Sequence, residues 1–227
     1  MDGLFVTGTG TEVGKTMVAA AIARTAATAG LEVAVFKPAV SGLDDDGEAD
    51  HALLRRAAGS SQSDDEIAPY RYGPAVSPHL GAELAGEAID PRRLRRAAAE
   101  AGTGADLLVV EGVGGWLVPL SGDYLVRDFA RELGFSVVVA ATPGLGTINH
   151  TLLTIEAVRS VGLELAAVVL TPWPDEPSQV ERSNRDAIER LGRVSVDTLP
   201  HLELSEPSSW PRFAPDGARW QRDGAPR

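Results

Sequence analysis

The stretch of sequence that decides the fold is Gly8-Thr9-Gly10-Thr11-Glu12-Val13-Gly14-Lys15-Thr16. A short apolar run at 4–7 precedes it, and a helical pattern of residues follows over about 15–29. Glycines let a backbone turn so that its N–H groups point at phosphate oxygens, and the N-terminus of the next helix adds the positive end of its dipole. Strand, Gly-rich turn, Gly-Lys-Thr and helix in this order predict a phosphate-binding loop.

Two side chains of this loop have the chemistry that a bound nucleotide needs. Lys15 would reach the β- and γ-phosphates, and the Thr16 hydroxyl would bind Mg²⁺. The usual motif has Gly five residues before its Gly-Lys pair, whereas this chain has Thr9 there and its nearest glycine is Gly8. We therefore expect a phosphate loop that is longer by one residue; the alternative is a Gly-rich turn with an incidental Lys.

Outward from the loop, short apolar runs alternate with longer helical stretches. The runs are 4–7, 33–36, 107–110, 137–141, 165–170 and 194–198, and the helical stretches are about 15–29, 48–58, 91–101, 124–133, 149–161 and 177–191. Strands without polar alternation are buried on both faces. We therefore expect an α/β fold with a single doubly wound, mostly parallel sheet and helices on both faces, of the phosphate-loop NTPase type, with ligands at the carboxyl ends of the strands.

The length of 227 residues suits one α/β domain rather than two. We expect a domain over residues 1–202 and an irregular, partly ordered C-terminal tail over 203–227. Residues 41–68 carry eight acids and two Arg. Most of that segment is therefore expected to be a solvated, mobile connection, in which a metal-binding acid could sit.

The composition excludes several classes of protein. With 32 acidic and 21 basic residues the formal net charge is −11, so we expect no nucleic acid partner. Cysteine is absent, which excludes disulfides, thiolate nucleophiles and Cys-ligated metals, and the four His have no metal-ligand spacing. We find no signal-peptide pattern, and no apolar run approaches the ~20 residues of a membrane span. A soluble cytoplasmic protein without a membrane partner is expected.

Lysine is rare in this chain, since Lys15 and Lys37 are the only two among the 21 basic residues. Codon bias toward Arg explains the scarcity, and the alternative is that Lys stays where a flexible point charge is required. Lys37 follows the run at 33–36 and would point into the ligand crevice, where a phosphate or a substrate carboxylate would pair with it. The other interpretation is a Lys that extends from a strand end into solvent.

Glu111 likewise ends an apolar run, at 107–110. In phosphate-loop enzymes an acid at this place holds Mg²⁺, and Glu111 fits that role, although a Glu exposed after a strand is also common. Residues 112–115 have little side-chain bulk, so a ligand could approach their backbone closely.

Taken together, these residues resemble the ATP-dependent dethiobiotin synthetase family. The resemblance covers residues 3 to about 202 in family order, and the longer phosphate loop is itself a family trait. Five motifs carry it: Thr7-Gly8-Thr9-x-Thr11-Glu12-Val13-Gly14-Lys15-Thr16, Lys37-Pro38-x-x-Ser41-Gly42, Ser77-Pro78-His79, Val110-Glu111-Gly112-x-Gly114-Gly115-Trp116 and Leu145-Gly146-Thr147-Ile148-Asn149-His150.

The resemblance implies a ligase reaction of biotin biosynthesis. In it 7,8-diaminononanoate, CO₂ and ATP with Mg²⁺ would give dethiobiotin, ADP and phosphate. In the family one amine captures CO₂ as a carbamate, whose oxygen attacks the γ-phosphate, and the second amine closes the ring on the resulting carbamic-phosphoric anhydride. Lys15, Lys37, Mg²⁺ and the loop amides would compensate the negative charges that this brings together. The resemblance also implies a homodimer.

Roles of single residues follow from the same resemblance. Those implied to be catalytic are Lys37, Lys15 and Thr11, those for the metal are Thr16, Asp50 and Glu111, and those for the substrate are Ser41, Thr147 and Asn149. Thr11 and Ser41 would contact the carbamate, while the loop at 146–149 would bind the substrate carboxylate across the dimer interface. The nucleotide would contact Glu12, Val13, Gly14, Lys15, Thr16, Met17, Asp50, Glu111, Gly112, Val113, Gly114, Thr171, Pro172, Pro200, His201 and Leu202.

Some positions depart from the family pattern. Gly10 stands where many members have Asp, Gly144 where some have Lys, and Thr171 where the family commonly has an Asn that contacts adenine. Thr has one hydroxyl in place of a bidentate amide, so the nucleotide is ATP or another NTP. The acidic stretch 44–50 differs in length from relatives, so its other acids are alternatives to Asp50.

Other classes of protein fit less well. A dinucleotide site would need a different glycine spacing, and a glutamine-dependent amidating synthetase, such as a cobyrinate amidating enzyme, would need a nucleophilic Cys. A DNA-binding partition ATPase has a Lys early in its phosphate loop, whereas 8–13 contain none. A regulatory GTPase would need Asn-Lys-x-Asp, which is absent. We expect the basic cluster at 92–96 to be a solvated helix face.

Overall fold

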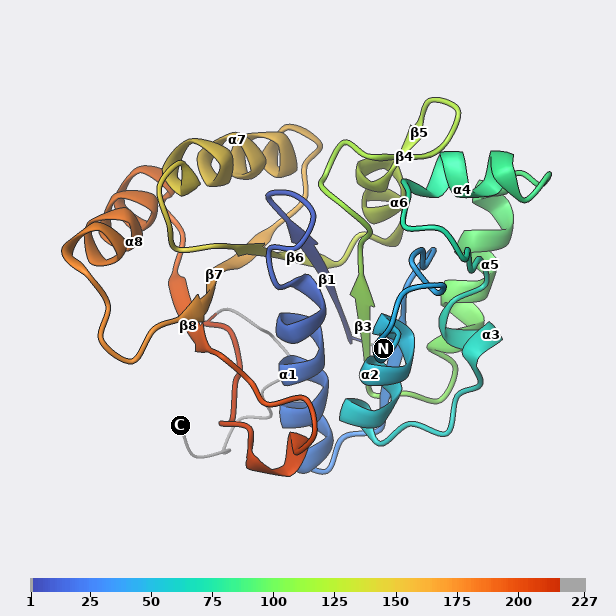
Figure 1. Ribbon diagram of the computed structural model, residues 1–227, viewed down its shortest axis with the longest axis horizontal. Helices are drawn as coiled ribbons and strands as arrows, with labels where there is room; N and C mark the ends of the chain where they lie inside the picture. Colours follow the sequence, from blue (N-terminus) through green and yellow to red (C-terminus); the bar gives the residue numbers. More distant parts are fainter. Residues whose placement is uncertain (1, 217–227) are drawn as a thin grey trace.

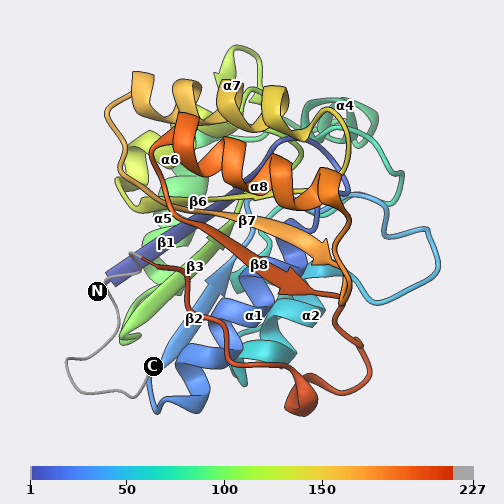
Figure 2. The same ribbon diagram turned by 90° about the vertical axis from the view of Figure 1, so that its left-hand side faces the viewer.

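A six-stranded parallel sheet forms the centre of the molecule (Figures 1 and 2). The computed structural model describes residues 2–216. The sheet order is β2-β3-β1-β6-β7-β8, and every pair of neighbouring strands is parallel. Its strands are β1 (Asp2–Gly8), β2 (Val33–Phe36), β3 (Leu107–Glu111), β6 (Ser136–Ala141), β7 (Leu165–Trp173) and β8 (Val196–Pro200). The predicted fold class is confirmed.

Helices cover both faces of the sheet, as Figure 2 shows. On one face, α1 (Lys15–Thr28) and α2 (Asp50–Ala58) pack together against the strands. On the other face lie α5 (Pro91–Ala101), α6 (Val126–Leu133), α7 (Thr147–Ser160) and α8 (Gln179–Gly192). Each layer buries its apolar stripe on the sheet, which is why the strands have apolar side chains on both faces.

Several short elements were not predicted from the sequence. They are α3 (Asp64–Ile67), α4 (Pro78–Leu84), the hairpin of β4 (Pro119–Ser121) and β5 (Tyr124–Leu125), and the 3₁₀ turn η1 (Pro207–Ser209). The helix expected from 124 begins at Val126 because the two residues before it pair with β4. The strand expected at 194–198 lies at 196–200, since α8 ends in Arg193 with a left-handed φ of 48°.

The prediction that most of 41–68 is a solvated connection was wrong. Helix α2 buries Leu53 and Leu54 in the core, and the short α3 buries Ile67. A capping box at Ser63 starts α3. Apart from Asp50, the acids of this segment lie on the solvent side, so its net charge concealed an amphipathic pattern. Within the segment, only residues 43–48 form a continuous exposed stretch.

Residues 203–216 run across the free side of α1, as Figure 1 shows. Trp210 and Phe213 are buried against that helix, and the Phe213 N–H donates to Thr25 Oγ1 at 2.8 Å. Residues 217–227 of the expected tail lie outside the described residues, so the division of the chain at 202 stays a prediction. Within 2–216, no helix is both long and apolar enough to cross a membrane.

The strand order determines where the functional groups meet. Strand β3 lies between β1 and β2, with Val6 beside Glu111 and Phe36 beside Val110. Because parallel strands end at one edge of the sheet, Glu111 and Lys37 lie next to the loop that follows β1.

Candidate active site

The loop between β1 and α1 has a tightly constrained backbone. Gly14 has a φ of 85°, and a Cβ added there would lie 2.4 Å from the Thr171 Cγ2 at the end of β7. Only glycine adopts this conformation at low cost in so little space. The first helical hydrogen bond of α1 joins the Val18 N–H to the Gly14 carbonyl, so the N–H groups of residues 15–17 have no acceptor in their own helix. Such a turn can receive an anion.

Lys15 lies over this loop. Its Nζ donates to the Gly10 carbonyl at 2.7 Å, and only 7% of the residue is exposed. Burial lowers the pKa of Lys15, the nearby Lys37 lowers it further, and the Glu111 carboxylate opposes both. A bound phosphate group would give this ammonium an anionic partner in a charge-assisted hydrogen bond.

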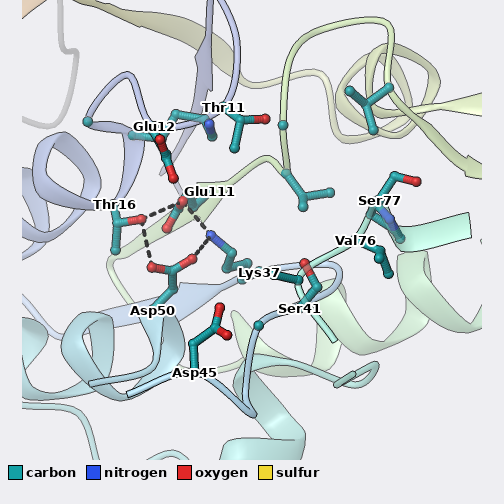
Figure 3. Close-up of a pocket in the computed structure, with 18 of the residues that line it drawn as sticks. Thr11, Glu12, Thr16, Lys37, Ser41, Asp45, Asp50, Val76, Ser77 and Glu111 are labelled. Carbon is teal, nitrogen blue, oxygen red and sulfur yellow. Dashed lines mark hydrogen bonds and ion pairs between the residues drawn. The ribbon is translucent and has the colours of Figure 1, made fainter. Parts of the chain in front are cut away.

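Four side chains from different elements form a network beside the loop (Figure 3). The Lys37 Nζ lies 2.5 Å from Glu111 Oε1 and 2.7 Å from Asp50 Oδ2. The Thr16 hydroxyl lies 2.9 Å from the same Glu111 oxygen and 3.1 Å from Asp50 Oδ1. A hydroxyl has one proton, so it donates to one carboxylate at a time. Lys37, which follows β2, thus lies between Glu111 and Asp50, and the alternative that it extends into solvent is wrong.

Burial and charge pairing act together on these groups. Burial alone would lower the pKa of Lys37, but the Glu111 and Asp50 carboxylates outweigh it and the pKa is raised. Burial would raise the pKa of Asp50, and Lys37 outweighs it, so that pKa is lowered. Glu111 is completely buried, which raises its pKa against the attraction of Lys37. Lys37 and Asp50 thus stabilise each other in their charged forms.

The residues at this place fit a magnesium ion. Glu111 Oε2 is buried and has no hydrogen-bond partner within residues 2–216, although buried carboxylate oxygens normally have one. Two carboxylates and a hydroxyl are the hard oxygen donors that Mg²⁺ prefers, with water and phosphate completing its shell. Among the described residues, no group of three or more His, Cys, Asp or Glu could enclose a metal alone. A metal held by Thr16, Asp50 and Glu111 would take its remaining ligands from water or phosphate.

A cavity of about 730 Å³ opens from this network. Of the residues predicted for the site, those that line it are Thr11, Glu12, Gly14, Lys15, Thr16, Met17, Lys37, Ser41, Asp50, Glu111, Val113 and Gly114. We call residues 11, 12 and 14–17 with Lys37, Asp50 and Glu111 the phosphate end of the cavity. A second side, which we call the loop wall, is formed by Ser41, Gly42, Asp45 and residues 75–78.

The other predicted residues do not line this cavity. Val13 points into the core, and the Gly112 N–H donates to the Val6 carbonyl of β1 at 2.8 Å. Three further groups of predicted residues lie outside the cavity lining, and their roles stay predictions. Thr171 and Pro172 lie at the end of β7, Pro200, His201 and Leu202 at the end of β8, and Thr147 and Asn149 at the start of α7. Thr147 is buried with its hydroxyl 3.3 Å from that of Thr151, while Asn149 is exposed.

Most residues of the loop wall were not predicted from the sequence to belong to the site. Asp45 was one of several acids in an exposed stretch, and Ala75 and Val76 carry no functional group. The Ser77-Pro78 motif was the available signal, because Pro at the first position of a helix marks the start of α4.

The parallel sheet, the Gly-Lys-Thr loop between β1 and α1, and the acid that ends β3 define a phosphate-loop nucleotide-binding protein. Comparison with known proteins identifies the family within this class. Residues 2–211 match the model of a family described as an AAA domain. The chain belongs to the ATP-dependent dethiobiotin synthetase family.

Curated relatives that carry the name "ATP-dependent dethiobiotin synthetase BioD" match most of this chain. The relative from Rhodococcus erythropolis is 42% identical over 208 residues, which cover 90% of this chain and 88% of that protein. The relative from Mycobacterium avium is 44% identical over 197 residues, covering 86% and 85%. The relative from Pseudomonas aeruginosa is 37% identical over 214 residues, covering 92% and 94%.

Proposed function

We propose that this chain is an ATP-dependent dethiobiotin synthetase, a ligase that forms two C–N bonds to close a cyclic urea. Its substrates would be 7,8-diaminononanoate, CO₂ and ATP, and its products dethiobiotin, ADP and phosphate. The observation that carries the proposal is the buried Lys37 between Asp50 and Glu111, placed between a phosphate loop and a cavity of about 730 Å³. The names of the relatives supply ATP and the product, dethiobiotin.

The reaction would proceed in three steps. A neutral amine attacks CO₂ and loses a proton to give a carbamate. A carbamate oxygen then attacks the γ-phosphorus, and ADP leaves. The second amine attacks the carbamoyl carbon of the mixed anhydride, so the C–O bond to phosphate breaks and the ring closes with loss of a proton. The second step brings two anions together, the carbamate and the triphosphate, and preorganised positive groups lower a barrier most where charge develops.

The phosphate end would supply those groups. Lys15 would move from the Gly10 carbonyl to the β- and γ-phosphates, and the free N–H groups of residues 15–17 would hold phosphate oxygens. Lys37 would bind oxygens of the carbamate and of the γ-phosphate while the phosphoryl group passes from ADP to the carbamate. A Mg²⁺ ion held by Thr16, Asp50 and Glu111 would neutralise charge on the triphosphate. Thr11 and Ser41 would orient the carbamate by their hydroxyls.

The substrate carboxylate and the adenine base would lie farther out. Thr147 and Asn149 begin α7 and would bind the carboxylate from a second copy of the chain in a homodimer. Leu145, which is 97% exposed just before that helix, is an apolar side chain that such an interface would cover. The base would lie between Thr171-Pro172 and residues 200–202. The enzyme would act in the cytoplasm.

A phosphate-release assay tests the proposal. With Mg²⁺ and ATP, we expect phosphate release that requires both diaminononanoate and bicarbonate, and parallel reactions with CTP and GTP give the nucleotide preference. Release that proceeds equally without the diamine would falsify the synthetase assignment.

A further inference from the structure

The loop wall contains a charged group that the proposed reaction does not yet use. Besides Asp45, the residues that form this wall, Ser41, Gly42 and 75–78, are uncharged. Figure 3 shows the Asp45 carboxylate directed toward the cavity, on the side of Lys37 and Asp50. No ion pair joins Asp45 to another residue of the described part of the chain. A carboxylate at this place can therefore receive a cation from the cavity.

The backbone that carries Asp45 is held in place. Residues 40–44 lie beside 70–74, with hydrogen bonds that include Gly42 N–H to the Pro74 carbonyl at 3.1 Å and Asp44 N–H to the Gly73 carbonyl at 2.9 Å. The Asp45 N–H closes a turn onto the Gly42 carbonyl at 3.2 Å. Gly42 has a φ of 82°, and a Cβ added there would lie 3.2 Å from Asp45 Oδ2, so the carboxylate folds back over this glycine. An exposed side chain is thus presented on a fixed turn.

The charges around the cavity are unevenly distributed. Lys15 and Lys37 both lie at the phosphate end, together with the acids Glu12, Asp50 and Glu111, of which Asp50 and Glu111 are paired with Lys37. An ammonium ion that enters the cavity is repelled by these two lysines and attracted by Asp45 on the loop wall. A carbamate or phosphate oxygen experiences the opposite forces. On the loop wall a cation therefore meets a carboxylate with no lysine among its neighbours, whereas the acids of the phosphate end share that place with both lysines.

A vicinal diamine needs such a separation. The amine that attacks CO₂ must be neutral, whereas its neighbour keeps a proton in neutral solution until it attacks in turn. We propose that Asp45 binds the ammonium group of the second amine and thereby selects a diamine over a substrate with a single amine. The inference rests on the proposed function, because it names the part of that substrate which the loop wall recognises.

Asp45 would act by binding and not as a metal ligand. The Thr16 hydroxyl bonds to Asp50 and Glu111 and not to Asp45. The ammonium gives its proton to water before ring closure, so the step needs no base from the protein.

The matched pair Asp45→Asn and Asp46→Asn tests the inference. Both remove one charge from the same exposed turn, but Asp46 does not line the cavity. For Asp45→Asn we expect KM for the diamine to rise about tenfold, as for the loss of one charge-assisted hydrogen bond. KM for ATP and the Mg²⁺ concentration for half-maximal rate should stay within about twofold, and Asp46→Asn should change none of the three values.

Calorimetry with nonanoate, which lacks both amines, separates the affinity for the amines from the affinity for the carboxylate and its carbon chain. Asp45→Asn should weaken binding of diaminononanoate and leave binding of nonanoate unchanged. An unchanged diamine KM in Asp45→Asn, or a raised Mg²⁺ requirement in its place, overturns the inference. If the unmodified protein shows no diamine-dependent phosphate release, the proposed function itself fails, so the two failures are distinguishable.

Discussion

The phosphate end and the loop wall are two sides of one cavity that are built in different ways. At the phosphate end, Lys37 follows the edge strand β2 and Glu111 ends the neighbouring strand β3; they are 3% and 0% exposed and bond to each other. The loop wall consists of Ser41, Gly42, Asp45 and residues 75–78. Its backbone is held by hydrogen bonds between 40–44 and 70–74, and its polar side chains have no partners in the described structure. One side is preorganised by side-chain contacts and the other only by its backbone.

This difference indicates a division of work. A buried network of charges cannot change one member without leaving another unpaired, so it suits steps in which charge develops in a fixed place. Exposed side chains on a fixed turn can change one at a time, so they suit the selection of a substrate. We therefore expect substitutions at the phosphate end to lower kcat or nucleotide affinity, and substitutions at the loop wall to raise KM for the diamine alone.

The largest effect is expected at the centre of the network. Lys37→Arg keeps the charge, but a planar guanidinium cannot replace a compact ammonium between two carboxylates. We expect kcat to fall about 10²-fold or more, with an unchanged melting temperature as the control for folding. Near-normal turnover would reduce Lys37 to a structural role and remove the contrast between the two sides.

A glycine pair tests the rigidity of the phosphate loop. In Gly14→Ala the new Cβ would meet Thr171 in a left-handed backbone, which costs on the order of 1–3 kcal/mol. A Cβ at Gly10 has its nearest neighbour at 3.9 Å, so Gly10→Ala is the matched control. By calorimetry with a non-hydrolysable ATP analogue, we expect Kd to rise about tenfold in the first and to stay within about twofold in the second. Equal affinities would show that the loop is not preorganised.

The metal position is tested through the Thr16 hydroxyl. In Thr16→Val we expect the Mg²⁺ concentration for half-maximal rate to rise about tenfold, because one oxygen donor is lost. Thr28→Val, at the exposed end of the same helix, should leave it unchanged. A Mg²⁺ titration of the rate measures both, and an unchanged requirement in Thr16→Val would place the metal elsewhere.

The smallest effect is expected on the loop wall. Ser41→Ala removes one hydroxyl, so KM for the diamine should rise about three- to tenfold, as for one neutral hydrogen bond. Initial rates over diamine and ATP concentrations measure both constants. A larger change in KM for ATP than for the diamine would contradict the division between the two sides.

Much of the phosphate end could be predicted from the sequence because local patterns determine it. Apolar runs that end in Lys37 and Glu111 place both at one sheet edge, and the Gly-Lys-Thr turn identifies its neighbour. The contact of Gly14 with Thr171 could not be predicted, since it joins residues far apart in the chain. The pairing of Asp50, rather than another acid of 44–50, with Lys37 depends on where α2 begins, and the resemblance alone indicated it.

The loop wall was harder to predict for a physical reason. Its backbone pairing between 40–44 and 70–74 alternates only over Tyr70-Arg71-Tyr72 and is interrupted by Gly42 and Gly73, and α4 is a seven-residue helix that contains a glycine. Short elements of this kind are stabilised by tertiary contacts rather than by their own propensity.

The most direct test of the central claim is a reaction with ¹³C-bicarbonate, diaminononanoate, ATP and Mg²⁺, in which phosphate release and label in the product are measured together. We predict one labelled carbonyl carbon in the cyclic product for each phosphate released. Phosphate release without labelled product, or labelled product without phosphate release, would contradict the account.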